Sequence, residues 1–344
     1  MKTLVTGSQG YIGTFLTNFL NENGVQVFGT DIGYYKDCNL TPVDDLVSTK
    51  SIDIRDICID DVVGFDAIVH LAALSNDPVG ELDEKLTYEI NYKATINLAQ
   101  LAKKAGVKRF VFVSTQSIYG ISNTEDELDE YSSVKNPQTA YAKTKWLAEQ
   151  ELKNLEGNDF AITYVRPSTV FGWSPRLRTD IVFNNLLLNG LKYGKIEVHS
   201  DGTPWRPIVH ISDLSRFILK VLEAPKDKIA GKAFNVGVIN GNYTVKQIAE
   251  AAQLCLPNST TITYNTENLV DPRSYKVSFN RAKEELGFSA ETNLITGGKD
   301  LLSNIKSMTE NKDILGKNTN RLTQLKHLLK LSILDKELRI AKEL

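Results

Sequence analysis

The chain has 344 residues, a formal net charge of −2, and 24% charged and 42% hydrophobic residues. This balance is typical of a folded globular protein and argues against a nucleic-acid or other polyanionic partner. The three cysteines (Cys38, Cys58, Cys255) contain no CxxC pair and the four histidines lie far apart, so we expect neither a disulfide framework nor a metal site.

The first predicted strand, residues 2–6, begins directly after Met1 and leaves no room for a signal peptide. No apolar run reaches the roughly 18 residues that a membrane span requires. We therefore expect a cytoplasmic protein without a membrane span.

Short β-rich runs alternate with helical patterns over the first two thirds of the chain. The predicted strands, which are rich in β-branched and aromatic residues, are 2–6, 25–30, 66–71, 109–114 and 161–166. The helical patterns between them cover residues 12–22, 88–105 and 138–155. Because these strands show little period-2 alternation, both faces of the sheet should be buried. The sequence thus predicts an α/β fold with a doubly wound parallel sheet of the Rossmann type.

Beyond residue 166 the alternation loosens, and we expect a smaller substrate-binding region interleaved with the first. Two further strand-like runs, 207–211 and 233–236, are expected to rejoin the sheet, and residues 244–254 and 280–286 are expected to be helical. The predicted division is therefore a dinucleotide-binding domain at 1–166 with 206–238 returning to it, a substrate-binding region at 167–205 and 239–305, and a helical extension at 306–344.

The extension carries leucines at helical spacing. Leu322, Leu325, Leu329 and Ile333 would form one apolar stripe. The favoured interpretation is an amphipathic helix that packs on the body or on another subunit; the alternative is a helix for a membrane surface or a partner.

A glycine-rich turn, TGxxGxxG, joins the first predicted strand to the first predicted helix. Glycines here permit a sharp turn, close approach of backbone N–H groups to a diphosphate, and tight packing of helix on strand. The strand–turn–helix context makes the pattern specific for a dinucleotide. The residues expected to bind the cofactor from this turn are Gly7, Gln9, Gly10, Tyr11, Ile12 and Gly13.

Asp31 stands at the end of the second predicted strand, about 20 residues after the glycines. A carboxylate at this place accepts hydrogen bonds from the adenosine ribose and repels a 2′-phosphate. The sequence therefore favours NAD over NADP, with an ordinary strand-end aspartate as the alternative.

Tyr141 and Lys145 lie four residues apart in a helical pattern and therefore on one face of the helix. A free tyrosine has a pKa near 10 and is a poor base at neutral pH, but a nearby ammonium group lowers the pKa of the phenol. The pair can then remove a proton from a sugar hydroxyl while hydride leaves the same carbon.

These features resemble the extended short-chain dehydrogenase/reductases, the nucleotide-sugar epimerase/dehydratase family. The resemblance runs from Met1 to about Phe288. It includes the glycine turn, the YxxxK pair and short motifs at residues 53–56, 70–73, 91, 114–120, 166–167 and 171–172. It implies NAD as cofactor, a nucleotide-sugar substrate, and a homodimer formed through the helices at 88–105 and 138–155.

The resemblance also implies roles for individual residues. Thr115 would hydrogen-bond the reacting hydroxyl, Lys145 would also hold the nicotinamide ribose, and Asn91 would anchor the sheet near the active site. Asp53 and Ile54 would contact the adenine. The remaining residues implied to bind the cofactor are Leu71, Ala72, Ala73, Asn91 and Ser114.

Gln116 and Ser117 help to choose the reaction, because family members that remove water from C5–C6 carry an acid and a base at these places. Neither residue here is a carboxylic acid, so the segment is more like that of 4-epimerases, and we expect a nucleotide-sugar epimerase. A dehydrogenase or ketoreductase, a 4,6-dehydratase and a non-catalytic dinucleotide sensor remain alternatives.

On the substrate side, the resemblance implies that Arg206 and Arg273 clamp the nucleotide diphosphate and that Asp271 holds its ribose. Fixed, permanently charged donors suit a diphosphate. Arg176 and Arg178 would add positive charge to the cleft. Thr169 and Ser75 depart from the asparagine and lysine that many relatives carry, so the sequence leaves the sugar open.

Overall fold

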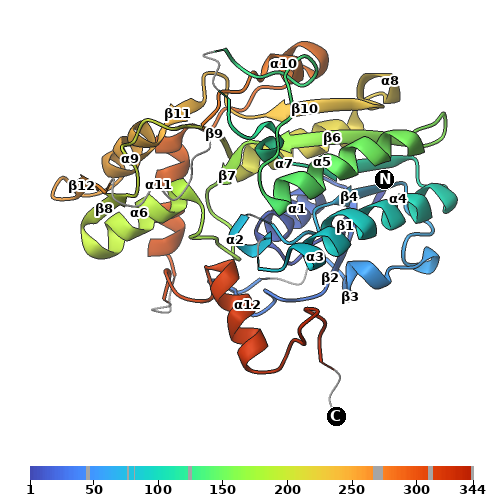
Figure 1. Ribbon diagram of the computed structural model, residues 1–344, viewed down its shortest axis with the longest axis horizontal. Helices are drawn as coiled ribbons and strands as arrows, with labels where there is room; N and C mark the ends of the chain where they lie inside the picture. The colour runs from blue at the N-terminus through green and yellow to red at the C-terminus, as the bar shows by residue number, and fades with distance from the viewer. Residues whose placement is uncertain are drawn as a thin grey trace.

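The computed structural model describes residues 1–43, 47–75, 77–80, 82–122, 126–265, 274–308 and 313–341. Its centre is a seven-stranded sheet in the order β10-β6-β5-β4-β1-β2-β3 (Figure 1). Neighbouring strands all run parallel, which confirms the predicted Rossmann-type sheet. The strands are β1 (Lys2–Thr6), β2 (Gln26–Asp31), β3 (Thr49–Ser51), β4 (Ala67–His70), β5 (Arg109–Val113), β6 (Ala161–Pro167) and β10 (Lys232–Val236).

Helices cover both faces of this sheet. α1 (Tyr11–Glu22) packs with α7 (Ile211–Glu223), whereas α3 (Glu84–Tyr88) and α4 (Ala94–Lys104) pack with α5 (Ala140–Leu152). Successive side chains of a strand point to opposite faces, so Phe110 and Val111 of β5 belong to different hydrophobic clusters. Both faces of the sheet are thus buried, which explains why these strands lack an alternation of polar and apolar residues.

A smaller three-stranded sheet lies beside the central one, in the order β11-β9-β7. It contains β7 (Thr169–Phe171), β9 (Trp205–His210) and β11 (Asn242–Thr244). The expectation that residues 207–211 rejoin the central sheet is wrong, because β9 pairs with β7 and β11 instead. The other run, 233–236, does join the central sheet as β10 beside β6.

The remaining elements complete the smaller region and the connections. β8 (Lys195–Val198) pairs with β12 (Thr261–Tyr264), and these strands lie against α6 (Val182–Tyr193) and α9 (Val245–Leu254). The others are α2 (Asp77–Gly80), α8 (Lys226–Ile229), α10 (Asn280–Leu286), α11 (Leu294–Lys306), the π-helical turn η3 (Glu89–Lys93), and the 3-10 turns η1 (Ile54–Asp56), η2 (Ile59–Asp61), η4 (Gln116–Tyr119) and η5 (Lys153–Leu155).

Within the described part of the C-terminal extension after α11 ends at Lys306, the helix is α12 (Arg321–Lys330), which packs on the body. Leu325 is fully buried there and Leu322 and Leu329 pack against the same cluster, whereas Ile333 lies beyond the helix and is exposed. A β-bridge between Leu334 and Ile340 closes the following turn. Among the helices of the described residues, none combines the length and apolarity needed to cross a membrane.

Candidate active site

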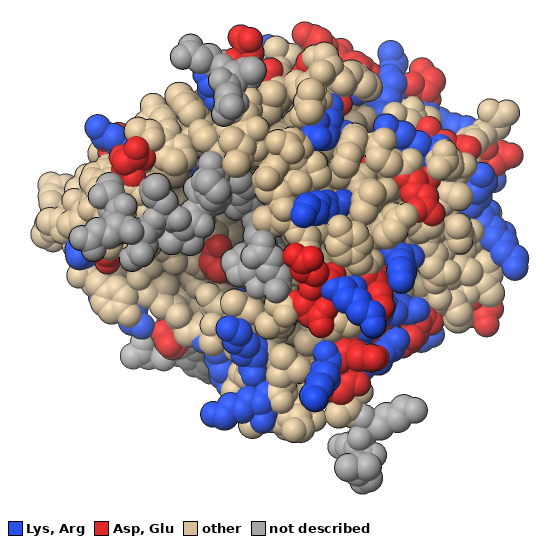
Figure 2. Space-filling view, viewed as in Figure 1, with Lys and Arg blue, Asp and Glu red and all other residues tan. Residues whose placement is uncertain are grey.

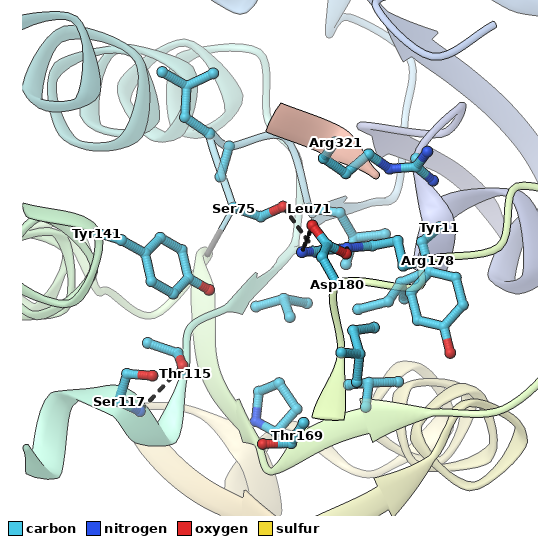
Figure 3. A pocket seen from close by; sticks show the side chains of 18 of the residues that line it. Tyr11, Leu71, Ser75, Thr115, Ser117, Tyr141, Thr169, Arg178, Asp180 and Arg321 are labelled. Carbon is cyan, nitrogen blue, oxygen red and sulfur yellow. Dashed lines mark hydrogen bonds and ion pairs between the residues drawn. The ribbon is translucent and has the colours of Figure 1, made fainter. Parts of the chain in front are cut away.

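A cavity of about 570 Å³ lies at the carboxyl ends of the central strands, the usual place for a ligand in such sheets. Side chains from several of these strands and their loops point into it (Figure 3). Its lining includes most of the residues predicted from the sequence: Gly7, Gly10, Tyr11, Ile12, Gly13, Asp31, Asp53, Ile54, Leu71, Ala72, Ala73, Ser75, Ser114, Thr115, Gln116, Ser117, Tyr141, Lys145, Thr169, Arg178 and Arg206.

The glycine turn leaves no room for a side chain at Gly7 or Gly13. Gly7 has a φ of +73°, and a Cβ there would lie 2.7 Å from the backbone nitrogen of Ala72. A Cβ on Gly13 would lie 2.0 Å from the carbonyl oxygen of Gly7, whereas one on Gly10 would be 3.3 Å from it. The turn therefore holds the start of α1 open to the cavity, which fits a dinucleotide diphosphate.

We expect Gly13→Ala to destabilise the fold by about 1–3 kcal/mol, because the added methyl overlaps backbone that cannot move freely. Gly10→Ala is the matched variant in the same turn and should stay within about 1 kcal/mol of the parent, since its methyl meets a single, more distant atom. Thermal unfolding of both variants measures the difference, and equal melting temperatures would contradict this account of the turn.

Asp31 is held in place at the end of β2 by two backbone groups. Its carboxylate accepts a hydrogen bond from Gln9 N at 3.0 Å and another from Gly33 N at 2.7 Å. Burial raises the pKa of Asp31, and these two hydrogen bonds oppose that rise. Gln9 thus supports the carboxylate through its backbone, while its side chain faces a smaller neighbouring cavity instead of the main one.

Asp31→Asn tests the predicted preference for NAD. The variant keeps the shape of the side chain but removes the charge, so NAD should bind about tenfold more weakly and the penalty against NADP should fall. Titrations of the parent and the variant with both dinucleotides measure this change. An unaltered NAD-to-NADP ratio would refute the assignment of Asp31 to the ribose.

At the far end of the cavity, Asp53 begins η1 and accepts a hydrogen bond from Arg55 N at 2.9 Å. The guanidinium of Arg55 pairs with the same carboxylate at 2.5 Å. The neighbouring Ile54 is buried at 8% exposure. A charged pair and an apolar side chain thus frame the place where the resemblance puts the adenine.

Tyr141 and Lys145 lie one turn apart on α5, whose start is capped by the hydroxyl of Thr139. The ammonium of Lys145 donates a hydrogen bond to Val113 O at 2.8 Å, and burial lowers the pKa of Lys145 to about 7. Thr115 accepts a hydrogen bond from Ser117 N at 3.1 Å. The hydroxyls of Tyr141 and Thr115 point into the same space (Figure 3).

Gln116 is fixed by the fold around it. Its amide donates to Arg166 O at 2.9 Å and accepts from the hydroxyl of Ser168 at 3.1 Å. Asn91, from the π-helical turn, does not line the cavity; its buried amide binds both the N–H and the carbonyl of Leu74. This arrangement ties the loop after β4 to the helices around α5.

On the substrate side, Arg178 pairs with Asp180 at 2.8 Å and donates to the hydroxyl of Ser75 at 3.2 Å (Figure 3). Thr169 lies on β7, and Arg206 lies on β9, where its guanidinium donates to Trp205 O at 2.9 Å. These polar groups come from separate segments and line the same cavity.

Arg176 does not line the cavity. It is buried and donates to Thr14 Oγ1 at 2.7 Å and to Lys36 O at 3.3 Å. Asp271 and Arg273 lie outside the described residues.

Sequence reasoning missed other lining residues that the fold contributes, among them Asp180, Tyr275 and Arg321. Asp180 lies two residues after Arg178, and the RxD spacing was the available signal. Tyr275 and Arg321 carried no such signal, because only the tertiary fold brings them to the cavity.

Comparisons with known proteins agree with this geometry. A sequence model of the NAD dependent epimerase/dehydratase family matches residues 3–237. This chain is 28% identical to UDP-glucose 4-epimerase of Caenorhabditis elegans, in a match that covers 86% of this chain and 94% of the relative. It is 25% identical to UDP-glucuronic acid decarboxylase 1 of Arabidopsis thaliana, in a match that covers 91% of this chain and 72% of the relative.

A solved structure, MoeE5 in complex with UDP-glucuronic acid and NAD, superposes with a TM-score of 0.76 at 25% identity. The match covers 99% of that chain but 89% of this one, so about a tenth of this chain has no counterpart there.

Proposed function

This chain belongs to the NAD dependent epimerase/dehydratase family and is an NAD-dependent enzyme, and from this premise we propose that it is a nucleotide-sugar epimerase acting at C4. The observation that carries the proposal is the environment of Gln116, whose amide is locked by two hydrogen bonds where a dehydratase carries an acid. Among the described residues, four carboxylates line the cavity, and they are held elsewhere. Asp31 accepts from backbone N–H groups, Asp53 pairs with Arg55 and Asp180 pairs with Arg178, while Glu197 lies on β8.

Bound NAD supplies the chemistry of accepting a hydride from the sugar carbon and returning it. The proposed roles of the protein side chains are to move and place the proton. Tyr141 takes the proton of the sugar hydroxyl, and Thr115 holds that hydroxyl in line. Lys145 in its ammonium form stabilises the phenolate of Tyr141, and burial keeps the pKa of this lysine at about 7. If the keto sugar rotates and is reduced on its opposite face, Tyr141 would return the proton to the oxygen, and the alcohol that forms would have the inverted configuration at that carbon.

We assign the diphosphate and sugar contacts to Ser75, Thr169, Arg178 and Arg206, which line the cavity. The roles of Asp271 and Arg273 toward the nucleotide stay predictions from the sequence. Gly7, Gly10, Gly13, Asp31 and the residues around them hold the cofactor. The division into a cofactor domain (1–166 with 206–238) and a substrate region (167–205 and 239–305) stays a prediction, with the correction that β9 belongs to the smaller sheet. A homodimer and a cytoplasmic location are parts of the same proposal.

The decisive experiment incubates the enzyme with UDP-, GDP-, CDP- and dTDP-sugars, uronic acids included, and follows stereochemistry by NMR and NADH by absorbance. An isomer that forms without net NADH supports the epimerase. Stoichiometric NADH, loss of water from the sugar, or release of carbon dioxide would each contradict it and identify a dehydrogenase, a dehydratase or a decarboxylase.

A further inference from the structure

The C-terminal segment (residues 313–341) runs along the rim of the cavity and contacts both of its sides. On the substrate side, Thr179 N donates a hydrogen bond to Thr319 O at 2.9 Å. On the adenine side, Arg55 Nη1 donates to Glu337 O at 2.8 Å. This segment lies far beyond residue 237, where the match to the family model ends. One of its residues, Arg321, nevertheless lines the cavity together with the glycine turn.

Charged side chains fasten the end of this segment to the adenine side. Arg339 pairs with Asp56 at 2.5 Å and lies 3.6 Å from Asp53. Lys and Arg side chains lie next to Asp and Glu over the lower part of the face shown in Figure 2. The phenol of Tyr34 also donates a hydrogen bond to Leu338 O. These contacts hold the C-terminal segment in one place relative to the cavity.

Arg321, the first residue of α12, projects into the same cavity as the glycine turn. It is on the side of the cavity where Tyr11 lies, across from Tyr141 (Figure 3). Its guanidinium lies 4.4 Å from the ring centroid of Tyr35 and donates to Arg176 O at 2.6 Å. The side chain is only 2% exposed, so packing fixes its position.

No carboxylate of the described residues lies within ion-pair distance of this guanidinium, although the charges of Asp180 and Asp31 act on it from farther away. The hydrogen bonds of Arg321 go to two backbone carbonyls, those of Arg176 and Asn318. A guanidinium has five N–H donors, so some of them are left for another acceptor. Burial lowers the pKa of Arg321, and the neighbouring charge of Arg178 lowers it further. By contrast, Arg178 has its own carboxylate, that of Asp180. A buried charge without a counterion is costly, so its retention at this place points to an anion supplied by a ligand.

We propose that Arg321 binds the diphosphate of NAD and that the C-terminal segment is therefore part of the cofactor site. The diphosphate is the anion that the glycine turn presents to this side of the cavity. Its oxygens suit the fork of a guanidinium that is already oriented by Tyr35. The inference rests on the NAD dependence of the enzyme and not on the sugar proposed above, so the sugar panel can fail while this proposal stands.

Arg321→Gln tests the proposal by ligand binding. In the full-length chain freed of nucleotide, calorimetry should show NAD and ADP-ribose binding about 10- to 100-fold more weakly, because one charged hydrogen-bonding partner is lost. Adenosine, which has no phosphate, should bind the variant and the parent equally. Arg321→Lys keeps the charge and should recover part of the loss. Lys326→Gln removes an exposed charge from the same helix and should change none of these affinities.

Two outcomes would overturn the proposal. One is unchanged affinity of Arg321→Gln for ADP-ribose; the other is an equal loss for adenosine and ADP-ribose, which would indicate packing alone. Amide hydrogen exchange on the parent protein gives a test that needs no variant. ADP-ribose should slow exchange in residues 318–330 while adenosine should not, and an identical effect of the two ligands there would also refute the diphosphate contact.

Discussion

Tyr141→Phe is expected to lower kcat by about 10²- to 10⁴-fold, the range for removal of a general acid–base. The change deletes one oxygen from a side chain that lines the cavity, and it leaves the ring on α5 next to Lys145. NAD affinity should stay within about threefold of the parent, because no buried charge is created. Turnover of the sugar identified by NMR and calorimetric titration of NAD measure the two quantities separately.

The control for this experiment is Tyr193→Phe, which removes a phenol oxygen from an exposed tyrosine on α6. Its kcat should match that of the parent. A Tyr141→Phe enzyme that retains near-parental turnover would remove Tyr141 from its proposed role as base. A variant that loses NAD binding together with turnover would instead assign Tyr141 to cofactor binding.

The sequence was a good guide wherever local pattern and chemistry coincide. The glycine turn, Asp31 and the pair on α5 are each defined by a strand end or by a helical spacing, and the fold places all of them on one cavity. The strand predictions for the central sheet agree with the structure to within a residue or so, because strands buried on both faces are nearly all apolar.

Pairing between distant segments was harder to predict. The run at 207–211 is as apolar as a central strand, yet it pairs with β7 in the smaller sheet. Nothing in the local sequence of β9 indicates which of the two sheets it joins. The contact between Arg178 and Ser75 shows the same limit, since only the folded chain brings Ser75 to Arg178 from another loop.

The C-terminal segment shows the same limit most clearly. The leucine spacing correctly predicted a helix that packs on the body, but it placed Ile333 on that helix, which ends at Lys330. Arg321 carries the further inference, although in the sequence it is an unremarkable basic residue at the start of a helix. Its significance comes from burial, from Tyr35 beneath it, and from the absence of a carboxylate partner among the described residues.

A buried ion pair behind α5 should matter strongly for stability. Glu149 and Arg166 are 1% and 3% exposed, and the guanidinium meets both oxygens of the carboxylate, at 2.6 Å at the shortest. Arg166 also donates to Tyr119 OH and Glu130 O. Glu149→Leu would leave that guanidinium buried and charged without its partner, so we expect a loss of about 3–5 kcal/mol in the free energy of unfolding.

Thermal and urea unfolding of a matched set separate the ion pair from simple helix effects. Lys143→Gln removes an exposed charge from α5 and should stay within about 0.5 kcal/mol of the parent. Glu149→Leu combined with Arg166→Met removes both charges and should recover much of the stability lost by the single change, because no unpaired ion remains. A double variant as unstable as the single one would mean that packing around α5, and not the uncompensated charge, sets the cost. If the pair acts as argued, Glu149 keeps α5 seated on β6, and through α5 it keeps Tyr141 and Lys145 facing the cavity.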